Sequence, residues 1–327
     1  MRERRKIVEL WQRGDAAVLV TLVHVEGSSY RRVGARVLIA ANGDSAGTVS
    51  GGCLEAEVVR KAKWMVRHGA IVERYSTLFD DTADIPYGLG CGGTVDLLLE
   101  PAGTAEFDAV MQAMAATLKG ERRQVVTRLQ ENSATLTREV RDERGELLFT
   151  SAKDAAGVCA SLEGHAFRAC PERSRRMPQS APQNLSFSPE GITEWHELLE
   201  PLQRLIVLGA GDDAQPMVQM AALLGWSVLV ADGRAQMARA ERFPEAERVV
   251  CADSIGEFAI CERDAVVIMS HSYEQDRAWL TEALPASPRY LGLLGARHRC
   301  SSFRPPPGAR KPVTSSSPRR RCRRRAA

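Results

Sequence analysis

From Leu205 onward, the chain alternates short apolar runs with segments of helical periodicity. This alternation is typical of strand–helix–strand units, which build parallel sheets with helices on both faces. Strands are predicted at 205–208, 227–231, 249–250, 265–269 and 290–294, and helices at 214–224, 235–242 and 275–284. The pattern therefore predicts a doubly wound, Rossmann-like α/β unit over residues 201–297.

The first strand of this unit leads into a glycine-rich turn. Gly209, Gly211 and Ala214 follow the pattern G-x-G-x-x-A between a strand and a helix, and Asp232 closes the next strand. The glycines of such a turn let a phosphate approach the backbone N–H groups at the helix start, and the acid can hold a ribose hydroxyl. These four residues predict a nucleotide or another phosphate-bearing ligand.

Two acidic residues inside this turn argue against ordinary NAD binding. Asp212 and Asp213 would repel a pyrophosphate at close range, although acids are favourable at a helix N-terminus. They either cap the helix beside a degenerate site or hold a metal that bridges to the phosphate. His271 follows the strand at 265–269 on its carboxyl side, where open parallel sheets bind ligands, and is therefore a candidate site residue. The alternative is that His271 is a solvated loop histidine.

Two cysteines in the first half of the chain lie inside glycine clusters. Gly51, Gly52 and Cys53 precede a helical pattern at 54–68, and Gly90, Cys91, Gly92 and Gly93 precede an apolar strand at 94–100. Glycine permits backbone conformations and close approaches that a side chain would forbid, so both cysteines are expected to be presented by the backbone and not packed in a core. The helix start favours the thiolate form of Cys53. The alternative is that the glycines form turns and the cysteines are small buried hydrophobes.

The rest of the first half is predicted to be a separate α/β domain over residues 1–160. Periodicity predicts helices at 6–13 and 107–118 and strands at 16–25, 35–41, 71–76, 124–129, 134–140 and 146–149. Residues 161–200 are expected to be a linker or insertion, because 164–190 is rich in proline and polar residues and shows no periodicity. Residues 298–327 form a basic tail rich in Pro, Ser and Arg, which is expected to be disordered.

Composition excludes several functional classes. The net charge of +3 depends on residues 301–327, which hold nine Lys and Arg; the first 300 residues carry 35 basic against 41 acidic residues, or −6. That body does not suggest a nucleic-acid surface. The eight cysteines form no C-x-x-C pair, which fits the reducing cytoplasm. The apolar run at 16–25 is too short to span a membrane, so no membrane association is expected.

The combined motifs resemble the XdhC/CoxI family of accessory factors for molybdenum hydroxylases. The resemblance is carried by segments 26–36, 47–57, 88–101, 205–213, 230–234, 243–246 and 290–295. It implies an XdhC/CoxI domain followed by a Rossmann domain, and a non-enzymatic role. It further implies that the chain binds molybdenum cofactor, supports its sulfuration and hands it to an apo-hydroxylase such as xanthine dehydrogenase. Cys53 and Cys91 would be the metal ligands, with Glu55 near the metal end. A cysteine desulfurase and a second copy of the chain are compatible partners.

The chain departs from the family pattern in two places. The family does not usually carry the stretch 164–190, and the resemblance stops after Arg297. The Rossmann-like unit is therefore expected to be truncated after its strand at 290–294, by a shifted reading frame or a shortened gene. The alternative is a genuine basic tail that binds RNA or acidic lipid.

Two other functions remain open from the residues themselves. The runner-up is an NAD(P)-dependent oxidoreductase, supported by the Gly209 turn and Asp232. The third interpretation is a folded remnant without function.

Overall fold

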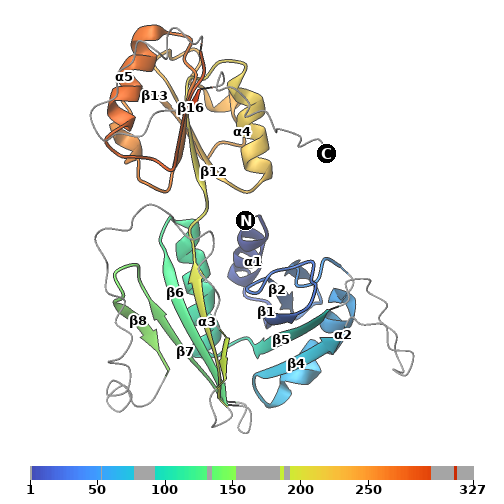
Figure 1. Ribbon diagram of the computed structural model, residues 1–327. Helices are drawn as coiled ribbons and strands as arrows, with labels where there is room; N and C mark the ends of the chain where they lie inside the picture. The colour runs from blue at the N-terminus through green and yellow to red at the C-terminus, as the bar shows by residue number, and fades with distance from the viewer. Residues whose placement is uncertain are drawn as a thin grey trace, which may run out of the picture. The chain divides into compact units, whose positions relative to one another are not determined.

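The computed structural model describes residues 2–52, 54–76, 93–130, 135–151, 185–187, 192–295 and 313–314. The chain divides into two compact units, Glu3–Pro201 and Leu202–Ala327, the second also including Met1–Arg2 (Figure 1). No helix in the described part of the chain is long and apolar enough to cross a membrane.

The first unit begins with helix α1 (Arg2–Gln12) and an antiparallel five-stranded sheet, sheet A. Its strands are β1 (Ala16–Glu26), β2 (Arg36–Ala40), β3 (Ser45–Gly47), β4 (Ile71–Ser76) and β5 (Thr94–Pro101), in the order β3-β2-β1-β5-β4. Helix α2 (Glu55–Met65) continues as a 3-10 turn, η1 (Val66–His68). Its apolar stripe, including Val58 and Ala62, packs on Val20, Leu97 and Leu99 of the sheet, so α2 covers one face of sheet A.

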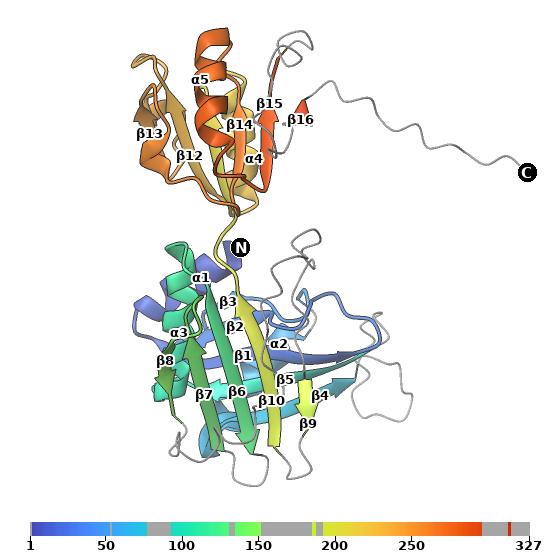
Figure 2. The same cartoon turned by 60° about the vertical axis from the view of Figure 1, so that its left-hand side comes forward.

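A second antiparallel sheet, sheet B, lies against the other face of sheet A. Its strands are β6 (Arg123–Gln130), β7 (Thr135–Arg141), β8 (Leu147–Thr150), β9 (Leu185–Phe187) and β10 (Ile192–Leu199), side by side in the order β8-β7-β6-β10-β9 (Figure 2). Helix α3 (Ala105–Leu118) and α1 share a buried core with both sheets, through residues such as Phe107, Leu19 and Val125.

Strand β10 lies within residues 161–200, which were predicted to be a linker or insertion. It pairs with β6 along its whole length, from Ile192 opposite Gln130 to Leu199 opposite Arg123. Alternate residues Thr193, Trp195 and Leu199 are buried, which is the period of a half-buried strand. The first unit therefore extends to Pro201 rather than ending near residue 160.

The second unit is built on a parallel six-stranded sheet, sheet C. Its strands are β11 (Arg204–Leu208), β12 (Ser227–Asp232), β13 (Arg248–Cys251), β14 (Ala265–Ile268), β15 (Tyr290–Leu293) and β16 (Val313–Thr314), in the order β13-β12-β11-β14-β15-β16. This is the 3-2-1-4-5-6 order of a doubly wound Rossmann sheet. Helices α4 (Ala214–Leu223) and α5 (Tyr273–Ala283) cover opposite faces (Figure 1). The predicted α/β fold class is confirmed.

Two details of the second unit differ from the prediction. The helix expected at 235–242 is reduced to a 3-10 turn, η2 (Ala240–Arg242); another, η3 (Gly256–Phe258), follows β13. The sheet also does not end at β15, because β16 pairs with it in parallel, Gly292 opposite Val313 and Leu293 opposite Thr314. The rest of the predicted tail lies outside the described residues.

Candidate functional site

The loop before α2 is organised around one carboxylate. Glu55 accepts hydrogen bonds from the backbone N–H groups of Val49 (2.9 Å), Ser50 (2.8 Å) and Gly52 (2.8 Å), and from the hydroxyls of Ser50 (2.5 Å) and Thr48. Partial burial acts to raise the pKa of Glu55, but the hydrogen bonds from Ser50 and Thr48 outweigh it and lower the pKa to about 2. The chain's own anion therefore occupies the ring of donors in this loop.

Positive φ angles explain two of the glycines in the cysteine clusters, and a close backbone contact explains a third. Gly51 and Gly52 have φ angles of +96° and +117°, which disfavour any side chain. A Cβ on Gly93 would lie 2.2 Å from the carbonyl oxygen of Ser28, so only glycine fits there. A Cβ on Gly51 would lie 3.7 Å from Cβ of Tyr30. Gly51 and Gly93 therefore both lie beside the segment that follows β1.

The cluster that contains Cys91 leads into β5 at the end of sheet A where β1 ends. Glu26 at the end of β1 is the register partner of Thr94 at the start of β5, directly after Gly93. Four of the predicted site residues, Cys53, Gly90, Cys91 and Gly92, lie outside the described residues. Among the described residues of the clusters, Gly93 lies against Ser28, and Gly51 lies beside Tyr30.

The glycine-rich turn of the second unit has the expected strand–turn–helix geometry. Gly209 has a φ of +119°, and a Cβ there would lie 2.4 Å from the carbonyl oxygen of Met269. A Cβ on Gly211 would lie 2.5 Å from a carboxylate oxygen of Asp213. Ala214 is buried at the start of α4. Gly209 therefore allows the turn after β11 to approach the backbone of Met269, directly after β14.

Asp232, predicted to hold a ribose, is fully buried and already bonded. Its Oδ2 accepts from the backbone N–H of Ala210 (2.7 Å) and from Nη2 of Arg234 (2.8 Å), while Oδ1 accepts from the backbone N–H (2.8 Å) and Nε (2.9 Å) of Arg234. Burial acts to raise the pKa of Asp232, but these hydrogen bonds outweigh it and lower the pKa. The acid holds the turn and Arg234 instead of offering a free oxygen.

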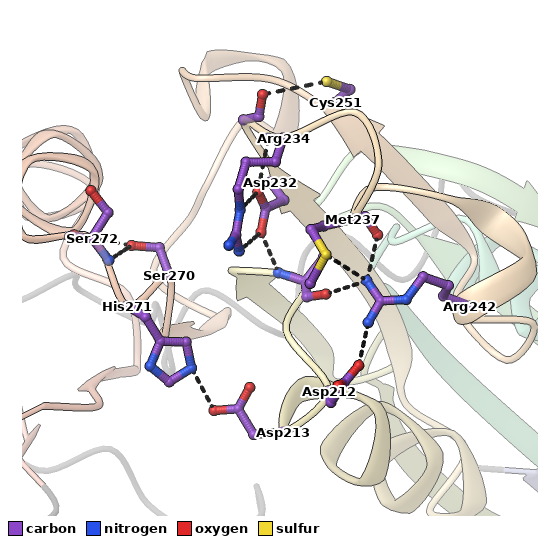
Figure 3. A network of polar contacts seen from close by, with 12 residues as sticks. Asp212, Asp213, Asp232, Arg234, Met237, Arg242, Cys251, Ser270, His271 and Ser272 are labelled. Atoms are coloured by element: carbon purple, nitrogen blue, oxygen red, sulfur yellow. Dashed lines mark hydrogen bonds and ion pairs between the residues drawn. The ribbon is translucent and has the colours of Figure 1, made fainter.

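A second arginine, Arg242, also donates hydrogen bonds to the turn. Arg242 donates to the carbonyl oxygens of Ala210 (2.7 Å) and Met237 (3.0 Å) and to the Asp212 carboxylate (2.6 Å), which is almost fully exposed (Figure 3). Both the backbone N–H and the backbone carbonyl of Ala210 are thus held by side chains. The sequence prediction missed Arg234 and Arg242; the Asp-Gly-Arg run at 232–234 was the available signal.

The side chains of Asp213, which follows β11, and His271, which follows β14, form a pair beyond the carboxyl ends of these two central strands. His271 Nε2 lies 3.0 Å from the Asp213 carboxylate, and His271 has a φ of +62°, which is unusual for a residue with a side chain (Figure 3). Asp213 is the N-cap residue of α4, yet its side chain makes no capping hydrogen bond. The expectation that it caps the helix is therefore not met, and its carboxylate faces His271 instead.

The described residues contain no group of three or more His, Cys, Asp or Glu side chains that could hold a metal ion. Two cysteines of the second unit are described, the exposed Cys251 and the half-buried Cys261. The Cys251 thiol lies 3.7 Å from the carbonyl oxygen of Gly233.

The antiparallel first unit and the glycine turn of sheet C define a two-unit protein whose second unit is a Rossmann domain. The XdhC and CoxI family model matches residues 10–76, and the XdhC Rossmann domain model matches residues 205–311. The chain belongs to the XdhC/CoxI family, as its sequence motifs predicted. The second match runs past Arg297, where the sequence analysis placed the end of the resemblance.

Named relatives agree with this assignment. The chain is 26% identical over 294 residues to a probable subunit of xanthine dehydrogenase from Bacillus subtilis, covering 87% of this chain and 81% of that protein. It is 38% identical over 106 residues to the "Molybdenum cofactor insertion chaperone PaoD" of Escherichia coli, 31% of each chain. A crystal structure described as a xanthine dehydrogenase from Bacillus halodurans matches with a TM-score of 0.70 at 25% identity, over 92% of this chain and 84% of that one.

Proposed function

We propose that this protein binds molybdenum cofactor and delivers it to a molybdenum hydroxylase of the xanthine dehydrogenase type. The observation that supports the proposal is that Gly51 and Gly93 both lie beside the segment after β1, at Tyr30 and Ser28. Each glycine belongs to a cluster that contains a cysteine. Thiolates are soft ligands that suit molybdenum and sulfur. The names of the relatives from B. subtilis and E. coli support the same role.

In this proposal Cys53 and Cys91 take the metal end of the cofactor. Cys53 comes two residues before α2, whose N-terminus favours the thiolate. Glu55 contributes by holding the N–H group of Gly52 at 2.8 Å, which shapes the loop directly before Cys53. This makes Glu55 a positioning residue, since its oxygens already accept several donors.

The test is to purify the full chain from cofactor-replete cells and oxidise any bound pterin to its fluorescent form. We expect pterin with the wild type and its loss in the double variant C53S/C91S. The matched control is C261S, a described cysteine of the second unit, which should retain pterin. Pterin retained by C53S/C91S would contradict the thiolate assignment, and its absence from every variant would contradict the function.

Delivery and sulfuration are tested separately from binding. Mixing the loaded protein with an apo-hydroxylase should restore hydroxylase activity, and adding a cysteine desulfurase with cysteine should increase it. Activity that stays unchanged on adding the desulfurase would remove sulfuration from the proposal but leave delivery. Light scattering on the purified protein tests the homodimer. The proposed location is the cytoplasm, where both partners would be found.

The strand order of sheet C favours a second ligand at the Gly209 turn, a nucleotide. An NAD(P)-dependent oxidoreductase is the corresponding second function. The bonding of Asp232 and the acids Asp212 and Asp213 oppose it, because a dinucleotide would meet no free ribose acceptor and two negative charges. Titration with NADH and NADPH, followed by nicotinamide fluorescence, separates the two functions. Micromolar binding would favour the oxidoreductase.

A further inference from the structure

A cleft of about 1040 Å³ lies within the first unit, apart from the glycine clusters and the Rossmann turn. Residues of α2 and η1 line one part of it, and residues of β6 and β10 line another. The first four residues of β4 also contribute. This volume is at the upper end of what sites for small ligands usually have, and the cleft is assigned no role by the family comparison or by the function proposed above.

The α2 part of the cleft carries a cluster of positive charge. Arg60 and Lys61 both pair with the carboxylate of Glu57, at 2.6 Å from Arg60. Arg67 lies over the ring of Trp64, 3.8 Å from its centroid, and donates to the Trp64 carbonyl oxygen. Among the described residues, no carboxylate pairs with Arg67. Arginine and lysine side chains whose positive charge is not fully neutralised by carboxylates favour the binding of a phosphate.

The carboxylate of Asp96 also lines the cleft, but its negative charge is already paired within the chain. It accepts from Nε and Nη2 of Arg74, at 2.7 and 2.9 Å, and lies 3.3 Å from Nδ1 of His24. Glu73 is the other acidic residue in the lining. An anion that enters the cleft therefore meets the three cations of α2 and η1, two of which pair with the same carboxylate.

The sheet B part of the cleft is aromatic and apolar. Trp195 is 8% exposed and packs with Val23 and Leu129. Its indole Nε1 is buried and has no hydrogen-bond acceptor among the described residues. Buried polar groups without partners are rare and call for an explanation. A flat apolar and aromatic floor suits a planar ring.

We propose that this cleft binds a phosphorylated planar heterocycle, with the phosphate on Arg60, Lys61 and Arg67 and the ring against Trp195. A nucleoside monophosphate and a phosphate-bearing pterin share this chemistry. The volume and the buried floor favour a small molecule over an acidic segment of a partner protein. The proposal concerns the cleft alone and does not require Cys53 or Cys91 to bind metal.

The test is isothermal titration calorimetry of the full chain at low salt with GMP, guanosine, neopterin monophosphate, neopterin and inorganic phosphate. We expect at least one phosphorylated heterocycle to bind. Its unphosphorylated form should bind at least about tenfold more weakly, because it lacks the contacts of the phosphate with the cations. GMP alone would identify a nucleotide site, and neopterin monophosphate alone a pterin site. If neither binds to the folded protein, the proposal is wrong.

Variants place the binding in the cleft. K61A/R67A removes two of the cations and leaves Arg60 to pair with Glu57, and we expect at least about tenfold weaker binding. W195F should weaken binding while its thermal melt reports folding. The matched control R144A changes an exposed arginine of the same unit and should bind as the wild type does. Unchanged affinity in K61A/R67A, or binding of a poly-glutamate peptide in place of the heterocycles, would overturn the proposal.

Discussion

The carboxylate of Asp232 and the guanidinium of Arg234 are joined by two hydrogen bonds, 2.9 Å from Nε to Oδ1 and 2.8 Å from Nη2 to Oδ2. Asp232 ends β12, the position from which many Rossmann domains hold a ribose. Because both of its oxygens accept donors from the protein, a nucleotide would have to displace Arg234 or bind without this acid. The strand order of the domain therefore does not by itself provide a dinucleotide site.

The first prediction concerns the stability that Asp232 provides. We expect D232N to lower the free energy of unfolding of the second unit by about 2–4 kcal/mol, because it leaves the buried N–H of Ala210 and the guanidinium of Arg234 poorly bonded. The pKa of Asp232 is lowered in the folded state. Its contribution is thus present above the unfolded value of 3.8 and is lost as the pH falls below it.

Urea denaturation at pH 7 and at pH 3 measures this contribution. D212N is the matched control, since Asp212 is 93% exposed and pairs only at the surface; it should change stability by less than about 1 kcal/mol. Equal effects of D232N and D212N would show that the burial of Asp232 is not what matters.

The second prediction concerns the pH dependence of the loop before α2. The pKa of Glu55 is about 2 in the folded protein, against 4.5 for the free side chain. Its stabilisation should be complete above about pH 5 and should fall as the pH drops toward 2. E55Q should cost about 1–3 kcal/mol at pH 7, because its amide N–H₂ faces donors. It should also flatten this acid dependence. Urea denaturation across pH 2–7 tests this, with the exposed Glu9 changed to Gln as control; a steep acid dependence that persists in E55Q would contradict it.

The third prediction separates two kinds of glycine. In G93A the new Cβ would lie 2.2 Å from Ser28 O, so the backbone between β1 and β5 must shift. In G52A the Cβ meets nothing within 4 Å, and only the φ of +117° is unfavourable. We expect G52A to cost about 1–2 kcal/mol and G93A to cost more. G93A should also reduce bound pterin further than G52A does. Chemical denaturation and pterin content measure both, and equal effects of the two variants would refute the close approach.

The fourth prediction concerns the ion pair that links sheets A and B. Glu100 of β5 accepts two hydrogen bonds from Arg138 of β7, at 2.8 and 3.1 Å, and both side chains are 2% exposed. E100Q should destabilise the first unit by about 3–5 kcal/mol, since it leaves a buried arginine without its counter-charge. The control E200Q alters a surface pair with Arg122 and should change stability by less than about 1 kcal/mol. Similar values for E100Q and E200Q would disprove this assignment.

Most helices and strands were predictable because local periodicity records which face of each element is buried. β4 was predicted at 71–76 and is observed at Ile71–Ser76, and the predicted strand at 205–208 is one residue shorter than β11. The predicted helix at 235–242 failed, since only Ala240–Arg242 is helical, as a 3-10 turn. There Arg242 bonds to the carbonyl oxygens of Ala210 and Met237, which are contacts that helical spacing does not encode.

The sequence alone determined the α/β class, the Rossmann alternation, the glycine-rich turn and the family, because these depend on spacings within short segments. Only the tertiary structure decided that β10 completes sheet B and that Arg36 pairs with Glu197 across 161 residues. It also decided that Asp232 and Glu55 bind their own chain. Hydrogen-bond partners are chosen by proximity in space, and proximity between distant segments is set by packing of the whole unit.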